Sequence, residues 1–337
     1  MPTPDTATPP IISLVCTVKN EADSIGALLD SMLAQTRPAD EIVINDCGSS
    51  DATVAIVEGY IARGHAIRLV HGGHNIPSGR NNAIRFSRGA IVACTDAGLT
   101  LDRHWLERIT RPLLDDEADV VGGFFHPAPG SLFEFALAAT NYRDAGEIDA
   151  ATFLPFGQSV AFRRHAWEQA GGYPEWASHC EDLLFDMALQ RAGMRFAFEP
   201  RAFVNFEPRS SFAAFARQYF NYARGDGVAG LWPKRHLARY ATYMGGTALA
   251  LVAARKPWVW LLHLAGLYAY CRKPWQRIRR RARNLPAPDF AHAALLVPLI
   301  RIVGDMAKMA GYPAGLLRRW RSPHLKAAQR AYWARWR

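Results

Sequence analysis

Two adjacent acids, Glu181 and Asp182, follow a glycine pair at 171–172 and precede an apolar, helix-like run over 183–192. Carboxylates in the first turn of a helix lie at the positive end of its dipole, which favours their ionised form. An ionised carboxylate can accept a proton from a substrate hydroxyl. Acids at this position also commonly just cap the helix, so the catalytic interpretation depends on the rest of the chain.

Polar residues also end several predicted strands. Apolar, β-branched runs predict strands at 11–18, 41–46, 66–70 and 90–95, and helical patterns alternate with them at 25–33, 52–62 and 78–87. The alternation predicts an α/β domain with a mostly parallel sheet flanked by helices. Ligands bind such sheets beyond the carboxyl ends of the strands. Thr17, Asp46 and Asp96 end three of these strands, so we expect them around one crevice.

Glycine-rich phosphate loops do not accompany these strands. The sequence has no Gly-x-Gly-x-x-Gly after the first strand and no Gly-x-x-x-x-Gly-Lys-Ser/Thr, which argues against dinucleotide-binding and P-loop proteins. Acids at strand ends suit ribose hydroxyls, a base N–H and a divalent cation bridging phosphates. Arg80 could meet a diphosphate as a charged fork. Asp46 and Asp51 are equally suited to capping turns, and the residues alone leave both roles open.

A series of short motifs resembles family-2 glycosyltransferases over roughly residues 11–226. The nucleotide-sugar half of that family resembles 17–21 (TVKNE), 42–51 (IVINDCGSSD), 79–82 (GRNN) and 95–98 (TDAG), and its acceptor half resembles 156–163 (FGQSVAFR), 171–173 (GGY) and 181–186 (EDLLFD). The resemblance implies a GT-A fold and inverting transfer from a nucleoside-diphosphate sugar, most often a uridine nucleotide. The Gln-x-x-Arg-Trp of processive members is absent, which favours transfer of a single sugar.

The resemblance also implies roles on the donor side. Thr17 and Glu21 would line the nucleotide pocket, and Asp46 would bind the base. Arg80 would approach the diphosphate. All four residues lie within the motifs 17–21, 42–51 and 79–82.

At the reaction centre the resemblance implies that Asp182 is the catalytic base, with Glu181 as its neighbour. Asp96 corresponds to the first acid of the family's Asp-x-Asp, which serves the ribose and a divalent cation, Mn²⁺ or Mg²⁺. Gly98 stands in place of the second acid, so one metal ligand is missing. We therefore expect a cation held through Asp96.

Charge divides the 337-residue chain into two parts with opposite signs. Residues 1–231 hold nine more acids than bases, residues 232–337 hold nineteen more bases than acids, and the net charge is +10. We expect a flexible leader over 1–10, a glycosyltransferase domain over 11–231 and a basic, apolar helical region over 232–337. Within the domain, 11–100 would be the nucleotide-sugar half and 101–231 the acceptor half. The basic region requires an anionic partner, either a membrane surface or nucleic acid.

Two nearly uncharged segments, 240–254 and 258–271, favour the membrane over nucleic acid. Each is about 15 residues, or roughly 22 Å as a helix, which is short of the roughly 30 Å hydrocarbon core. We therefore expect a hairpin in or along the cytoplasmic leaflet of the cell membrane. A short spanning hairpin and two buried helices of a soluble domain remain as alternatives. A third apolar piece, 290–303, is broken by Pro298 and Arg301.

The leader has neither a basic nor an apolar region of a secretory signal, and five scattered cysteines fit reduced thiols rather than zinc. The sequence thus favours a membrane-associated enzyme that passes one sugar to a lipid-linked or envelope saccharide. Gly98 keeps open a non-catalytic relative that binds nucleotide-sugars or protein partners. A sugar nucleotidyltransferase would need a glycine-rich basic loop, which residues 19–21 do not supply.

Overall fold

The computed structural model describes residues 10–282 and 286–336, so residues 1–9 of the expected leader lie outside the described residues. Contacts divide the chain into two compact units that interleave along the sequence. The first unit takes in residues up to His126 and Ile148–Phe206, and the second takes in Pro127–Glu147 and Glu207–Arg335. Two stretches from before residue 232 therefore fold with the basic C-terminal helices.

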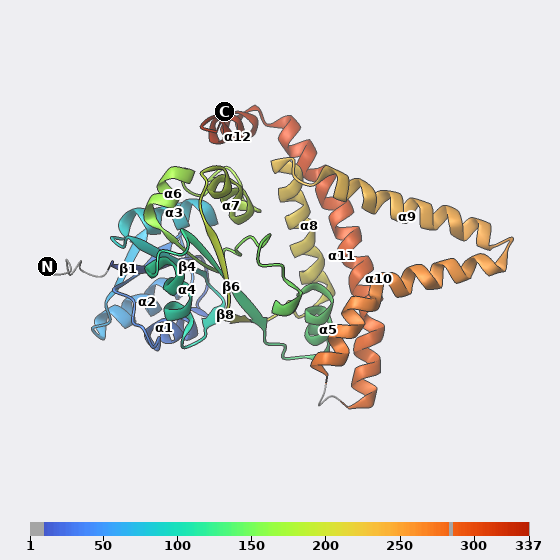
Figure 1. Cartoon of the computed structure of the whole chain (residues 1–337), viewed down its shortest axis with the longest axis horizontal. Coiled ribbons are helices and arrows are strands. Elements are labelled where there is room, and N and C mark those ends of the chain that lie inside the picture. Colours follow the sequence, from blue (N-terminus) through green and yellow to red (C-terminus); the bar gives the residue numbers. More distant parts are fainter. Residues whose placement is uncertain (1–9, 283–285, 337) are drawn as a thin grey trace, which may run out of the picture. The chain divides into compact units, whose positions relative to one another are not determined.

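The first unit is built on one eight-stranded sheet with helices packed on it (Figure 1). The strand order is β3-β2-β1-β4-β7-β6-β8-β5. The strands are β1 Ile12–Val18, β2 Glu41–Asp46, β3 Ile67–His71, β4 Ile91–Asp96, β5 Leu99–Leu101, β6 Val120–Pro127, β7 Ser159–Arg163 and β8 Phe196–Phe206. The helices are α1 Ile25–Leu33, α2 Thr53–Ala62, α3 Ile76–Phe86, α4 Trp105–Leu114, α6 Arg164–Ala170 and α7 Glu181–Arg191.

This arrangement confirms the predicted α/β sheet flanked by helices. β1 lies between β2 and β4, and β2 pairs with β3, all in parallel. Beyond β4 the pairing turns antiparallel, with β7 antiparallel to both β4 and β6 and β5 antiparallel to β8, so the sheet as a whole is mixed. Parallel neighbours require a long crossover connection, usually a helix. The chain between β6 and β7 instead passes through the second unit, and β7 returns in the opposite direction.

Burial accounts for these strands and for their helical cover. Every residue of β1 and β2 is buried, as expected for parallel strands covered on both faces. α1 places its buried residues on one face, at Ile25, Leu28, Leu29 and Met32. The strand ends are consequently held on a rigid platform.

The carboxyl ends of β1, β2 and β4 meet at one edge of the sheet, as predicted. Thr17 is in register with Asn45 on one side and with Asp96 on the other. Val18 is in register with Asp46. The acids that end two separate strands therefore flank the end of β1.

The second unit is helical. Its helices are α5 Leu132–Asn141, α8 Phe212–Ala229, α9 Pro233–Ala253, α10 Trp260–Arg281, α11 Ala287–Arg321 and α12 Pro323–Ala334, with short 3₁₀ turns η1 Ala145–Glu147 and η2 Pro257–Val259. α5, α8, α10 and α11 share one apolar core. Its buried members are Ala136, Leu137, Ala139, Phe215, Cys271, Ile278, Ala293, Val297 and Ile300.

Glycines allow α8 and α11 to pack backbone against backbone. A Cβ atom on Gly311 would collide with the carbonyl oxygen of Phe220, and one on Gly315 would collide with that of Arg224. A Cβ atom on Gly227 of α8 would likewise meet the carbonyl oxygen of Tyr312. Small residues spaced by four are typical of closely packed apolar helices. Any larger residue at these positions would push the two helices apart.

α11 is one continuous helix through Pro298 and Pro313, and it contains the apolar piece noted over 290–303. A proline inside a helix frees the carbonyl four residues earlier. For Pro298 that carbonyl belongs to Ala294, and it accepts the indole N–H of Trp275 at 2.9 Å. For Pro313 it belongs to Met309, and it accepts the hydroxyl of Tyr240 at 2.5 Å. Side chains of α9 and α10 thus satisfy the groups that the prolines leave free.

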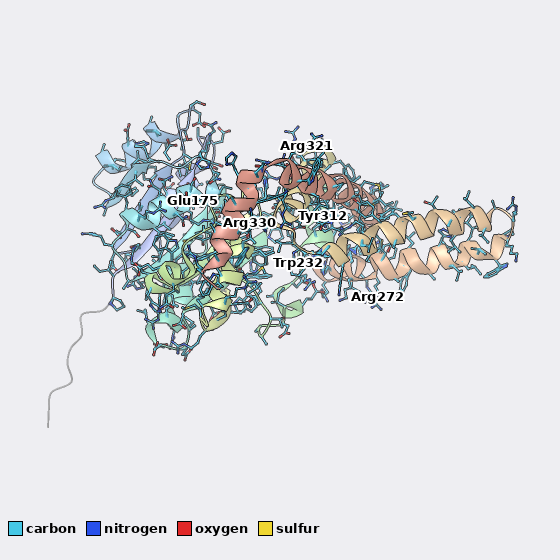
Figure 2. The ribbon with its side chains drawn as sticks, turned by 90° about the horizontal axis from the view of Figure 1, so that it is seen from above. Glu175, Trp232, Arg272, Tyr312, Arg321 and Arg330 are labelled. Carbon is cyan, nitrogen blue, oxygen red and sulfur yellow. The ribbon has the colours of Figure 1, made fainter. Side chains whose placement is uncertain are left out.

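α9 and α10 run side by side as a hairpin joined through η2 (Figures 1 and 2). Their apolar side chains are largely uncovered, with Met244 and Leu251 each 71% exposed and Leu261 65% exposed. This exposure argues against two buried helices of a soluble domain. Among the described residues, α11 is the helix that is long and apolar enough to cross a membrane, and 22% of its apolar window is buried.

Candidate functional site

Asp46 ends β2, and the turn that follows uses its carboxylate. Oδ2 accepts the backbone N–H of Gly48 at 3.0 Å, and Oδ1 accepts that of Ser49 at 3.1 Å. His71 Nδ1 lies 3.5 Å from Oδ2. Burial alone would raise the pKa of Asp46, but the hydrogen bonds from Ser49 and Gly48 hold it below its ordinary value. The residue expected to bind a base therefore also shapes this turn.

Glu21 and Asp51 are fixed by local hydrogen bonds as well. Glu21 Oε2 accepts the hydroxyl of Ser24 at 2.7 Å, and the Glu21 N–H donates to Thr53 Oγ1 at 2.7 Å. Asp51 Oδ1 accepts the Thr53 N–H at 3.0 Å, and its Oδ2 accepts the Ala22 N–H at 3.1 Å. For Asp51 the structure shows the turn-capping role.

The first turn of α3 lies directly on the strand ends. Thr17 is buried, and its hydroxyl donates to the carbonyl of Asn45 at 3.3 Å. A Cβ atom on Gly79 would collide with Thr17 Oγ1 and Cys47 Sγ. Glycine at position 79 is thus what lets α3 approach the ends of β1 and β2.

Asn81, one residue after Arg80, ties α3 to the glycine turn before α7. Its side-chain oxygen accepts the N–H of Tyr173 at 2.8 Å, and its Nδ2 donates to the Tyr173 carbonyl at 2.8 Å and to Glu175 Oε1 at 2.9 Å. Gly172 has φ +74°, and a Cβ atom there would lie 2.9 Å from Asn81 Oδ1. Both the backbone conformation and the space require glycine.

Arg80 is buried at the centre of the site, 2% exposed, instead of projecting into solvent. Its Nη2 donates to Asp96 Oδ1 at 2.5 Å. Its Cζ lies 4.8 Å from the centroid of the Tyr173 ring, and a Cβ atom on Gly157 would lie 2.9 Å from Nη1. Nε and Nη1 are buried and have no hydrogen-bond partner. A buried guanidinium with two free donors is an unfavourable arrangement unless an acceptor arrives.

The predicted base lies in the first turn of α7, which begins after Cys180 in a left-handed conformation (φ +62°). Asp182 Oδ1 accepts the N–H of Leu183 at 2.8 Å, and Oδ2 is 3.4 Å from the N–H of Gly157. Burial and the neighbouring charge of Asp182 raise the pKa of Glu181 to about 7. Glu181 is therefore partly protonated near neutral pH.

Asp186 is a third acid of α7, one turn beyond Asp182. It is 2% exposed, and its Oδ2 has no hydrogen-bond partner. Burial, followed by the charge of Asp182, raises its pKa well above the ordinary range, and the charge of Arg80 opposes this shift. Arg80 is thus a positive centre that acts on acids from both β4 and α7.

Gly98 has φ +75°, a conformation that side chains rarely adopt. A Cβ atom there would begin 3.9 Å from Glu21 Oε2. Within residues 10–282 and 286–336, no cluster of three or more His, Cys, Asp or Glu side chains could hold a metal ion. Arg80 uses only Oδ1 of Asp96, so Oδ2 remains for a cation. Mg²⁺ and related ions are commonly held by one or two carboxylates plus substrate phosphates, and Asp96 fits that pattern.

Sequence reasoning did not assign Asn81, Tyr173, Gly157 or Asp186 to the site. Asp186 carried a usable signal, because residues four apart share a helix face with the predicted base. Asn81 and Tyr173 contact each other across ninety-two positions of the chain, and no local pattern reports such a contact.

Solved structures show which fold this sheet represents. The structure resembles the mannosyltransferase PcManGT from Pyrobaculum calidifontis, solved in complex with GDP-Man and Mn²⁺, with a TM-score of 0.54. The two chains are 20% identical, and the match covers 96% of this chain and 90% of the other. The fold is that of a GT-A glycosyltransferase.

Sequence comparison relates about half of the chain to a glycosyltransferase family. The family model described as "Glycosyl transferase family 2" matches residues 13–169. Glycosyltransferase AglE of Haloferax volcanii is 25% identical over 228 residues, covering 66% of this chain and 74% of AglE. The uncharacterized glycosyltransferase EpsJ of Bacillus subtilis is 29% identical, covering 34% of each chain. Residues 13–169 therefore match glycosyl transferase family 2, and the protein is a glycosyltransferase.

Proposed function

We propose that the protein transfers one sugar from a nucleoside-diphosphate sugar to a lipid-linked or envelope saccharide at a membrane, with inversion at the anomeric carbon. The observation that carries this proposal is the set of α7 acids arranged around Arg80, which also holds Asp96 at the end of β4. The proposed proton acceptor and the proposed diphosphate contact therefore belong to the same unit.

Asp182 is the proposed base. Its carboxylate takes the proton of the acceptor hydroxyl while that oxygen forms a bond to the anomeric carbon. The bond from this carbon to the diphosphate oxygen breaks, and the nucleoside diphosphate leaves with its electron pair. A single displacement of this kind inverts the anomeric centre. Asp182 suits the role because it lies in the first turn of a helix and is only partly buried.

Arg80 is the proposed contact to the diphosphate, since two of its donor nitrogens, Nε and Nη1, have no acceptor. Thr17, Glu21 and Asp46 are the proposed nucleotide contacts. Asp96 would hold Mn²⁺ or Mg²⁺, which would neutralise charge on the departing diphosphate. PcManGT was solved with GDP-Man and Mn²⁺, and this supports a nucleotide-sugar donor and a cation for the present chain.

Membrane association of the second unit is proposed from two features. α11 has the length and composition of a spanning helix. The α9–α10 hairpin exposes Leu, Met and Trp side chains that water solvates poorly, including Trp258 at 62%. A membrane-bound enzyme would meet a lipid-linked acceptor there, and the basic residues favour the cytoplasmic face. A flotation assay with the full-length protein and vesicles tests this part.

The donor can be tested by the thermal stability of the detergent-solubilised protein with UDP, GDP, CDP or dTDP, each with and without Mn²⁺. A nucleotide at 100 times its dissociation constant adds about 2.7 kcal/mol of stability. We expect one nucleotide to stabilise the protein more strongly with Mn²⁺, and Asp96→Asn to remove the Mn²⁺ increment. The exposed Glu168→Gln is the matched control. If no nucleotide stabilises the protein, the donor assignment is wrong. A non-catalytic relative that binds protein partners then becomes the favoured interpretation.

A further inference from the structure

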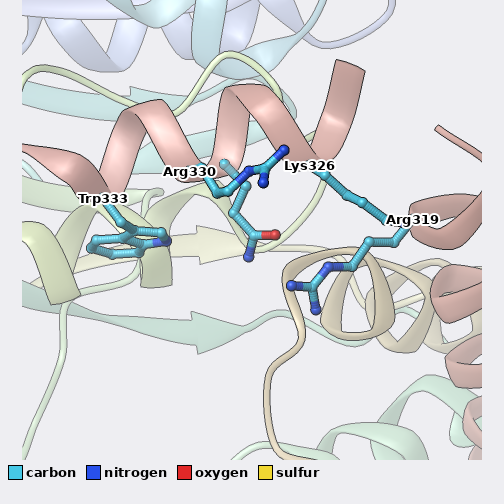
Figure 3. Close-up of a pocket in the computed structure, with 5 residues that line it drawn as sticks. Arg319, Lys326, Arg330 and Trp333 are labelled. Carbon is cyan, nitrogen blue, oxygen red and sulfur yellow. The ribbon is translucent and has the colours of Figure 1, made fainter. Parts of the chain in front are cut away.

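A pocket of about 280 Å³ lies in the second unit, where α11 ends and α12 follows (Figure 3). Arg319 from the last turn of α11 lines it, together with four residues of α12: Lys326, Gln329, Arg330 and Trp333. The α12 residues recur at intervals of three or four positions, so they share one face of that helix.

Three cations line this pocket without a neutralising acid. Over the residues that the structure describes, no carboxylate forms an ion pair with Arg319, Lys326 or Arg330. Other basic residues of the same unit do have such partners: Arg239 lies 2.7 Å from Asp305, and Arg277 lies 2.7 Å from Glu147. The pocket therefore holds uncompensated positive charge in a concave place.

The end of α8 helps to hold the pocket in shape. Gln329 Nε2 donates to the carbonyl of Ala229, the last residue of α8, at 2.7 Å. Gly230 follows with φ +74°, and a Cβ atom there would collide with Arg319 Nη1. Glycine at this position leaves space for the guanidinium beside the helix terminus, where its negative dipole end favours a cation. Two of the pocket's side chains are thus positioned before any ligand binds.

We propose that this pocket binds the terminal phosphate or diphosphate of a membrane lipid. Guanidinium groups bind phosphate oxygens in a planar, two-pronged geometry, and Lys adds a point charge. Three cations suit a group with more than one negative charge better than a phosphodiester with a single charge. Half-buried Trp333 supplies an apolar wall beside the cations.

A lipid is favoured over a soluble phosphate by the surroundings of the pocket. Trp320 is 71% exposed, and Leu316 and Leu317 are about two-fifths exposed, all in the last turns of α11. Basic and aromatic side chains at the end of an apolar helix are typical of the headgroup level of a membrane. The inference rests on the membrane association proposed above, and it adds a specific headgroup site to it.

The test compares two variants with the same loss of charge. The pocket variant combines Arg319→Gln, Lys326→Gln and Arg330→Gln. The control combines Arg272→Gln, Lys273→Gln and Arg279→Gln. These are exposed positions of α10 that do not line the pocket and form no ion pair with another described residue; Figure 2 labels Arg272 and Arg330. Full-length proteins in neutral detergent are titrated with dihexanoyl phosphatidic acid, dihexanoyl phosphatidylglycerol and inorganic pyrophosphate.

We expect wild type and control to bind phosphatidic acid about tenfold more tightly than phosphatidylglycerol, a difference of roughly 1.4 kcal/mol. The pocket variant should bind the two lipids equally. An unchanged nucleotide-induced stabilisation would show that the first unit of the variant remains folded.

Equal lipid preference in the pocket and control variants would overturn the proposal. Pyrophosphate binding as tightly as phosphatidic acid would identify the ligand as a soluble phosphate, and preference for a single-stranded oligonucleotide would identify nucleic acid. The failure of membrane association as a whole is separate, because wild-type protein would then not float with vesicles at all.

Discussion

The carboxylates at the strand ends and those on α7 belong to the same unit but to opposite electrostatic environments. Asp46 accepts hydrogen bonds from the turn that follows it, and these lower its pKa against the effect of burial. Asp186 has one oxygen without a partner, and burial raises its pKa. The pKa of Glu181 is shifted in the same direction, to about 7.

This difference distinguishes acids that stabilise the fold from acids that reduce its stability. A carboxylate that is better solvated by backbone N–H groups than by water adds stability at neutral pH. A desolvated carboxyl subtracts from it, and perturbed groups of this kind concentrate at functional sites. In the proposed mechanism the α7 acids carry the chemistry, whereas Asp46 holds the turn that follows its strand.

The largest effect should come from Asp182→Asn. Removing a general base lowers kcat by about 10²- to 10⁴-fold, while the dissociation constant of the nucleotide should change less than twofold. Transfer rates with radiolabelled donor and nucleotide-induced thermal shifts check both expectations, with Glu168→Gln as control. Retained turnover, or loss of nucleotide binding, would contradict the assignment of Asp182 as the base.

Asp46→Ala should destabilise the first unit by about 2 kcal/mol at pH 7, because charge-assisted hydrogen bonds to Gly48 and Ser49 are lost. The folded-state pKa of Asp46 is lowered, so its contribution is present above the unfolded value near 4 and is lost as the pH falls below it. Denaturant unfolding at pH 7 and pH 3 measures the difference. If the difference in unfolding free energy between wild type and variant were equally large at both pH values, the carboxylate charge would not be responsible for it. Asp23→Ala, at an exposed position, is the control.

Glu181→Gln should change the pH dependence of transfer more than its maximum. In wild type the ionisation of Glu181 near pH 7 adds a negative charge beside Asp182, which favours movement of the acceptor's proton toward this pair of acids. We expect kcat/KM to rise through pH 7 in wild type, and the variant to lack this inflection and to be up to about tenfold slower at pH 8. An inflection that persists in the variant would assign it to another group.

The smallest effect is expected for Asp186→Asn, which should increase the free energy of unfolding. The folded-state pKa of Asp186 is raised, so the wild-type protein loses stability as the pH rises above the unfolded value near 4. Asparagine is neutral at every pH and avoids that loss. At pH 8 the variant should gain about 1 kcal/mol, or roughly 2–4 °C in Tm, and the gain should vanish below pH 4. A loss of stability at pH 8 would mean that the ionised carboxylate has a partner.

The meeting of the strand ends at one edge of the sheet could be predicted because its signals are local. Alternation of apolar residues fixes the strands, and parallel strands place their carboxyl ends at one edge, so Thr17 and Asp96 had to be neighbours. The burial of Arg80 could not be predicted in this way. It depends on Gly157 and Tyr173, which lie far along the chain and come close only in the folded unit.

The continuity of α11 through its prolines also depends on distant residues. Proline is a strong helix breaker by itself. Trp275 and Tyr240 reverse that outcome by binding the two free carbonyls, and both come from other helices. The residues that decide the outcome are therefore not those next to the proline.

The interleaving of the two units has a consequence for synthesis on the ribosome. α5 and α8 emerge early, but the apolar core that they share is completed by α10 and α11. The apolar faces of α5 and α8 therefore stay uncovered until more than fifty further residues beyond α8 have been synthesised. A gene truncated after residue 231 would yield a fragment with the glycine face of α8 permanently uncovered, so a soluble catalytic core requires redesign of α5 and α8.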